Sequence, residues 1–63
     1  MKVWRVISTS ADGRGTGEQF QERWRAEEAY EAARQTGAVV TLAEFRNGQQ
    51  TEIIRDSRWE KVK

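Results

Sequence analysis

Cysteine and histidine are both absent from this sequence of 63 residues. The chain therefore forms no disulfide, and a metal site built on either residue type is excluded. A domain of this size buries only about 60% of the surface that its unfolded chain exposes, so small folds often depend on such links. Apolar packing must stabilise the fold instead, and the aromatic residues are expected to be mainly core material: Trp4, Phe20, Trp24, Tyr30, Phe45 and Trp59.

The sequence also lacks a strong excess of charge, because 11 basic and 10 acidic residues leave a net charge of +1. Such a balance gives no strong attraction to nucleic acid or to a membrane surface. No apolar stretch resembles a signal peptide or a membrane span. We expect a single domain over residues 1–63, in the cytoplasm, with no membrane partner, no bound metal and no cofactor.

The N-terminal half begins with a strand and a turn. Residues 2–9 are β-branched and aromatic without a helical period, which predicts a strand. The Asp12-Gly13 pair that follows is typical of a turn. The glycines of residues 13–17 lack the spacing of a dinucleotide fingerprint and the Lys-Ser/Thr end of a phosphate loop, so we interpret this segment as a flexible hairpin loop.

Residues 18–36 allow two interpretations. One is a long helix from Gly17, with Thr16 as its N-cap, which gives the order β-α-β-β. The other is a strand over residues 18–24 followed by a short helix over residues 26–35, which gives β-β-α-β-β. We prefer the second, because a single long helix would carry two separate apolar stripes. The short helix would have Glu27 and Glu28 at its N-terminal end.

The C-terminal half predicts a hairpin. Residues 38–45 and 50–56 are strand-like, and Asn47-Gly48 between them is typical of a type I′ turn. Gly37 is expected to end the helix. Residues 57–63 are a tail or an extension of the last strand. The predicted fold is α+β: a small antiparallel sheet of three to four strands, with one helix packed on one face.

Strand alternation assigns side chains to two faces of this sheet. The face under the helix would carry Trp4, Val6, Phe20, Trp24, Val40, Leu42 and Ile54, which would pack against Ala29, Tyr30 and Ala33. The opposite face would carry Val3, Arg5, Ile7, Gln21, Arg23, Val39, Phe45, Ile53 and Arg55. One helix covers only one face, so this second face should stay exposed, and exposed apolar patches usually mark partner sites. The alternative is that the strand register differs, or that the tail with Trp59 folds back over it.

No group of residues predicts catalysis. Glu27, Glu28 and Glu31 form an acidic cluster that we interpret as the solvated face of a helix. Ser8, Thr9 and Ser10 have no histidine to activate them and no evident lysine partner. We therefore expect no catalytic residue, and a protein that is not an enzyme.

The first functional hypothesis is a small interaction or regulatory domain that binds a protein partner, or a second copy of itself, through the exposed sheet face. Its interface would contain Val3, Ile7, Val39, Phe45 and Ile53. The alternative is a nucleic-acid-binding module that uses arginines of the same face and nearby aromatic residues, with contacts from Arg5, Arg23, Arg55 and Arg58.

A pattern in the first half adds slightly to the nucleic-acid alternative. Trp4, Asp12-Gly13, Phe20 and residues 26–29 follow the order aromatic strand, turn, aromatic strand and acidic helix start. In this respect about half of the chain resembles the N-terminal arm-binding domains of phage-type integrases, which bind DNA. Those domains have no hairpin after the helix, whereas residues 38–56 predict one.

Overall fold

A computed structural model describes residues 1–60 of the chain. Its elements follow the order β1 (Lys2–Thr9), β2 (Gly15–Phe20), α1 (Arg23–Gln35), β3 (Val39–Arg46) and β4 (Gln49–Asp56). The strands form one sheet in the order β2-β1-β3-β4, and every neighbouring pair is antiparallel. The predicted β-β-α-β-β arrangement, with one helix against an antiparallel sheet, is confirmed.

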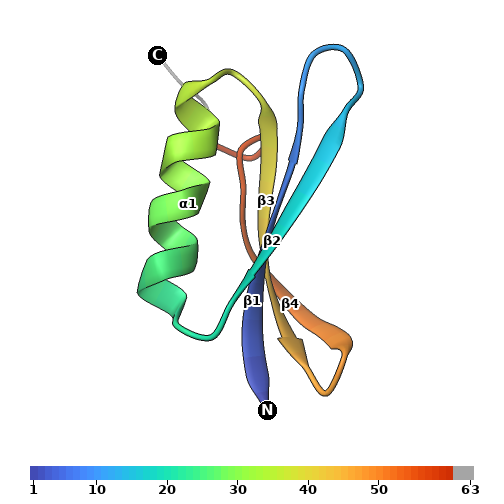
Figure 1. Cartoon of the computed structure of the whole chain (residues 1–63), viewed down its shortest axis with the longest axis vertical. Coiled ribbons are helices and arrows are strands. Elements are labelled where there is room, and N and C mark those ends of the chain that lie inside the picture. Colours follow the sequence, from blue (N-terminus) through green and yellow to red (C-terminus); the bar gives the residue numbers. More distant parts are fainter. Residues whose placement is uncertain (61–63) are drawn as a thin grey trace.

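The helix covers one face of the sheet. β2 pairs with one edge of β1, and β3 pairs with the opposite edge. α1 connects β2 to β3, so the chain crosses over β1 through the helix. In Figure 1 the helix lies on one side of the strands, and no other element of residues 1–60 lies on the opposite side. The sheet therefore has a covered face and an open face.

The boundaries of β2 and α1 differ from the prediction. β2 spans Gly15–Phe20 rather than residues 18–24, and α1 begins at Arg23 rather than at residue 26. The last β2 pair joins Phe20 to Trp4, and β1 begins at Lys2, so β1 offers no partner beyond residue 22 and the strand cannot extend to Trp24. An ion pair between Arg23 and Glu27, four residues apart, supports the added helical turn. Glu27 and Glu28 consequently lie outside the first turn.

The core lies between α1 and the two central strands. Val6, Val40 and Leu42 from the sheet pack against Ala26 and Tyr30 from the helix, and all five are buried. Partly buried side chains surround them: Trp4, Phe20, Ala29, Ala33, Ala38 and Ile54. These positions were predicted for the core, except Ala26 and Ala38. The prediction for Trp24 was wrong, because the extra helical turn turns it outward and leaves it 57% exposed.

The turns follow the local sequence signals. Asn47 and Gly48 have φ angles of 50° and 82°, as the predicted type I′ turn requires. Gly37, with φ of 87°, directly follows the helix C-cap Thr36, as expected. The first hairpin loop is shorter than predicted, because Ser10 and Arg14 already pair through their backbones and Gly15 belongs to β2.

Two irregularities in the β3–β4 pairing decide which way β4 side chains point. Leu42 pairs with Arg55 but Ala43 pairs with Ile53, so Ile54 is an extra residue in β4. A bulge of this kind changes the side-chain alternation. Ile53 therefore shares the open face with Ala43, whereas Arg55 lies on the helix side with Leu42. The prediction that Arg55 lies on the open face was wrong for this reason.

The chain turns back after β4. Residues 57–59 form a turn, and residues 61–63 of the predicted tail lie outside the described residues. Trp59 is 63% exposed, so it is not packed into the sheet. Within residues 1–60, α1 is too short and too polar to cross a bilayer, for which roughly 20 apolar residues are needed.

Candidate functional site

The open face of the sheet carries an apolar surface formed by the central strands and β4. The register places Val3 opposite Phe45, and Ile7, Val39 and Ile53 lie on the same face. Ile7 and Val39 are each 41% exposed and Ile53 is 36% exposed. Val3 and Phe45 are half-buried. The structure thus brings together all five residues that the sequence predicted for an interface, on a surface that residues 1–60 leave uncovered.

Arg5 lies at the centre of this open face. It pairs with Ala43 in the middle of β3, and its guanidinium stacks over the Phe45 ring at 4.7 Å from the ring centroid. Its Nε donates a hydrogen bond of 3.1 Å to Oε1 of Gln19 on β2. The contact with the ring and the hydrogen bond together restrain the guanidinium between β2 and β3.

A small hollow of about 270 Å³ opens beside Arg5. Ile7, Gly17 and Gln19 line it together with Arg5, and Glu18 contributes to its rim. A side chain built on Gly17 would meet no atom within 4 Å, so the missing side chain leaves this space open. Glu18 pairs with the core residue Val6, so strand alternation directs its side chain to the other face.

The four arginines predicted for nucleic-acid contact do not share one surface. Arg5 is on the open face, Arg23 is on α1, and Arg55 is on the helix side of β4. Arg58 lies in the turn after β4. The predictions that Gln21 and Arg23 lie on the open face were wrong, because β2 ends before both residues.

Arg55 is the centre of an ion-pair cluster that joins α1 to β4 and the turn after it. Its Nη1 lies 2.8 Å from Oε2 of Glu31, and its Nη2 lies 2.9 Å from Oε2 of Glu60. The guanidinium also covers the Tyr30 ring, 4.3 Å from its centroid. These contacts hold Arg55 over the Tyr30 ring at the edge of the core, and we assign Arg55 a structural role.

Tyr30 is fully buried beneath this cluster and donates a 2.6 Å hydrogen bond from its hydroxyl to Glu60. Burial and the bond to a carboxylate both oppose ionisation of the phenol, and they raise the pKa of Tyr30 to about 12. The bonds from Tyr30 and Arg55 lower the pKa of Glu60 below its ordinary value.

Asp56 is a buried carboxylate, 1% exposed, at the end of β4. The Arg58 guanidinium donates from Nε to Oδ1 at 3.0 Å and from Nη2 to Oδ2 at 2.7 Å, and the Arg58 backbone N–H donates to Oδ1 at 2.9 Å. The bond from the Arg58 side chain is the main reason that the pKa of Asp56 falls to about 2. Arg58 is therefore occupied by a structural partner.

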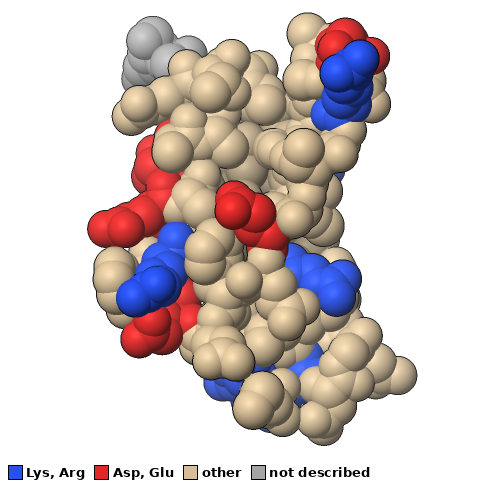
Figure 2. All heavy atoms as spheres, viewed as in Figure 1, with Lys and Arg blue, Asp and Glu red and all other residues tan. Residues whose placement is uncertain are grey.

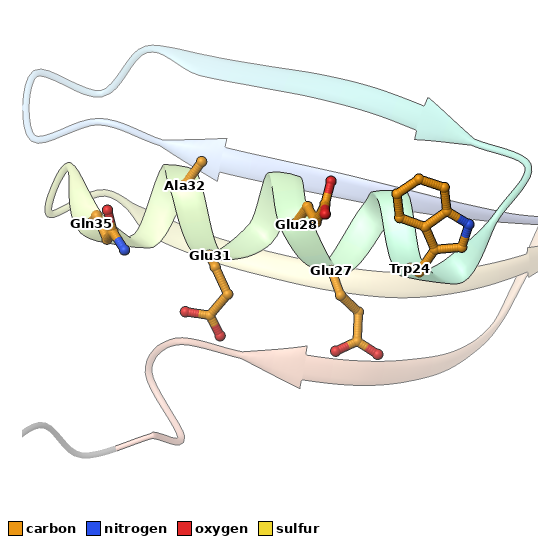
Figure 3. Close-up of a pocket in the computed structure, with 6 residues that line it drawn as sticks. All are labelled: Trp24, Glu27, Glu28, Glu31, Ala32 and Gln35. Atoms are coloured by element: carbon orange, nitrogen blue, oxygen red, sulfur yellow. The ribbon is translucent and has the colours of Figure 1, made fainter.

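The outer face of α1 forms a shallow hollow of about 600 Å³, lined by Trp24, Glu27, Glu28, Glu31, Ala32 and Gln35 (Figure 3). Acidic side chains gather over this helix in Figure 2, with basic side chains among them. Glu27 and Glu31 point toward β4 in Figure 3, where both pair with Arg55. No group of residues in the described range 1–60 has the arrangement of a metal site.

Two residues of the open-face hollow had no assigned role at the level of sequence. The sequence placed Gly17 in a loop or at the start of a long helix, and Gln19 in a strand or in the first turn of that helix. The alternation of Gly15, Gly17 and Gln19 along one side of β2 is the pattern that could have indicated them. It becomes meaningful only once the register places Gly17 opposite Ile7 and Gln19 opposite Arg5.

Comparison of the chain with known protein families, with curated proteins and with solved structures finds no match. The resemblance of the first half to integrase arm-binding domains therefore has no support from a family match. The functional argument accordingly depends on the geometry of the open face.

Proposed function

We propose that this protein is a small interaction domain that binds another protein, or a second copy of itself, through the open face of its sheet. The observation that carries the proposal is the group of five apolar side chains on that face, over which no helix or strand of residues 1–60 lies. Exposed apolar surfaces of this kind usually mark interaction sites. The interface consists of Val3, Ile7, Val39, Phe45 and Ile53.

The position of the five residues also supports the proposal. They come from the two central strands and β4, whose backbones are held by antiparallel pairing, so the surface is rigid before a partner binds. A preorganised surface loses little conformational entropy on association. Ala43, which pairs with Arg5 at the centre of the face, is fully buried.

The nucleic-acid alternative has less geometric support. Arg23, Arg55 and Arg58 each pair with a carboxylate, and only Arg5 of the four lies on the open face. A backbone-binding surface needs several arginines or lysines directed at successive phosphates. We therefore propose protein binding as the function and keep oligonucleotide binding as a competing outcome of the tests.

The first experiment compares wild type with Ile53→Glu, which places a charge on the open face, and with Trp24→Glu, a matched control on the exposed face of α1. Sedimentation equilibrium at micromolar concentrations measures self-association of all three. Random peptides displayed on phage are then selected on the wild type, and amide NMR shifts locate each selected peptide. Circular dichroism checks that each variant is folded, as expected for substitutions at exposed sites.

Two outcomes support the proposal. One is a dimer that Ile53→Glu abolishes and Trp24→Glu preserves. The other is a monomer whose selected peptides shift the amides of Ile7, Val39 and Phe45 and bind Ile53→Glu more weakly. A monomer that selects no peptide, or selects peptides that bind the helix, would overturn the proposal.

A further inference from the structure

We infer that the hollow formed by Arg5, Gly17 and Gln19 recognises a carboxylate, so that the partner is a different protein that presents an acidic residue among apolar ones. This inference rests on the proposed function of the open face. It adds the chemistry of the partner and the residues that select it.

The first observation is that Arg5 has no acidic partner. Within residues 1–60, each of the other seven arginines lies in an ion pair with a carboxylate: Arg14, Arg23, Arg25, Arg34, Arg46, Arg55 and Arg58. Arg5 instead pairs with the neutral amide of Gln19. Within residues 1–60, Arg5 is thus the arginine whose charge no carboxylate neutralises, so it can pair with an acidic group of another molecule.

The second observation is that the donors of Arg5 are oriented. Its Nε is used by Gln19, and in residues 1–60 its two terminal nitrogens have no hydrogen-bond partner. Because stacking on Phe45 fixes the plane of the guanidinium, these two nitrogens present a fork of the kind that binds both oxygens of a carboxylate. The Gln19 amide accepts from Arg5 through Oε1, which leaves its nitrogen as a further donor.

The third observation is the space itself. The hollow of about 270 Å³ adjoins these donors, and Gly17, where a Cβ would face open space, is part of its lining. Arg5 is flanked by Val3 and Ile7 on β1 and by Phe45 on β3. A partner segment therefore meets one positive group set in an apolar surface, which complements an acidic residue flanked by apolar residues.

The same geometry disfavours a second copy as the occupant. A symmetric face-to-face dimer centred on the open face would bring two Arg5 side chains together, because Arg5 lies near the centre of that face. Like charges placed together in an interface oppose association. Asp56 does not offset them, because it is buried against Arg58. Glu18 borders the hollow, but it pairs with the core residue Val6, so strand alternation directs its side chain to the other face.

The test uses the peptides selected on the wild type. We expect them to be enriched in Asp or Glu flanked by apolar residues. For one such peptide, replacement of the acidic residue by its amide is combined with Arg5→Gln in a double-mutant cycle. We expect each single change to weaken binding by roughly fivefold or more, and the second change to add little, as charge-assisted hydrogen bonds at a partly exposed site would give.

Two further variants separate the hollow from the overall charge. Gly17→Val places a side chain that suits a strand in the hollow beside Arg5, and we expect a similar loss of affinity with an unchanged amide spectrum elsewhere. Arg14→Gln removes the same charge from the hairpin loop, away from the open face, and we expect it to leave the affinity unchanged.

Three outcomes would overturn the inference. If peptides without acidic residues bind the open face, or if wild type forms a dimer through it, the proposed function stands and the carboxylate site is wrong. If mixed-sequence oligonucleotides displace the selected peptide from Arg5 at moderate salt, the site binds phosphate instead. Failure of the proposed function is distinct, because then no selected peptide maps to the open face.

Discussion

Ionisation of Tyr30 gives a direct test of the packing between α1 and β4. Tyr30 is the single tyrosine of the chain, so the near-ultraviolet absorbance of tyrosinate reports this residue alone. The ring is fully buried under Arg55, and its hydroxyl donates to Glu60. We expect the native protein to titrate with a pKa of about 12, against 10.0 for an unperturbed tyrosine.

The size of the effect on stability follows from this difference. A difference between 10.0 and about 12 corresponds to roughly 2.7 kcal/mol. The Glu60 side chain is 32% exposed, and solvent screening reduces the value to roughly 1.5–2.5 kcal/mol. Because the pKa is higher in the folded state, this stability is fully present below pH 10 and is lost as the pH rises to about 12.

The assay is a pH titration of absorbance, combined with urea unfolding at several alkaline pH values. Tyr30→Phe is the matched variant, because it removes the hydroxyl and keeps the ring under Arg55. We expect it to lose roughly 1–2 kcal/mol at neutral pH, since a hydrogen bond to a charged group is lost. Its stability should then fall less than that of wild type between pH 10 and about 12.

One result would refute this reasoning. If Tyr30 in the folded protein titrates near 10.0, as it should in urea, then its hydroxyl is neither buried nor bonded to Glu60. Equal alkaline pH dependence in wild type and Tyr30→Phe would lead to the same conclusion.

Three more predictions concern the stability of the fold. The pKa of Asp56 is lowered from 3.8 to about 2, so the ionised side chain should stabilise the fold by roughly 1–2 kcal/mol after screening at the exposed Arg58. This stabilisation should be present above about pH 4 and be lost as the pH falls to about 2, and Asp56→Asn should unfold more easily in urea at neutral pH and show less acid dependence. Gly48→Ala should lower the free energy of unfolding by roughly 1–2 kcal/mol in thermal or urea unfolding, because the φ of Gly48 is 82°. Gly17→Ala, at a position with open space and no positive φ, should be nearly neutral, and equal losses in the two variants would contradict the assigned turn. Leu42→Ala should lose about 2–5 kcal/mol in the same assay, and a loss below 1 kcal/mol would place Leu42 outside the core.

Much of the fold could be predicted because its signals are local. Asn47 and Gly48 adopt the left-handed conformation that a type I′ turn requires, and few other residue pairs do so without strain. Ala29, Tyr30 and Ala33 recur at helical spacing, which placed them on the covered face before the sheet was known. The five apolar residues of the open face were assigned by strand alternation alone.

The boundary between β2 and α1 was not predicted, because it depends on where β1 begins. Residues 18–24 alternate well enough to form a strand, and Trp24 then joins the core. In the folded protein the pairing of β2 with β1 ends at Phe20 and Trp4, and β1 begins at Lys2, so no strand could pair beyond residue 22. The chain therefore turns at Gln21 and Glu22, and Trp24 lies on the outer surface of the helix.

The sequence by itself thus determined the element types, the tight turns and the apolar character of the open face, since each depends on the conformational preferences of neighbouring residues. Only the tertiary structure decided the face on which each charge lies. The bulge at Ile54 moves Arg55 to the helix side, where it pairs with Glu31. The pairing of β1 with β2 brings Arg5 to Gly17 and Gln19. Strand register brings together residues that are distant in sequence, and a single extra residue reverses the face to which the following side chains point.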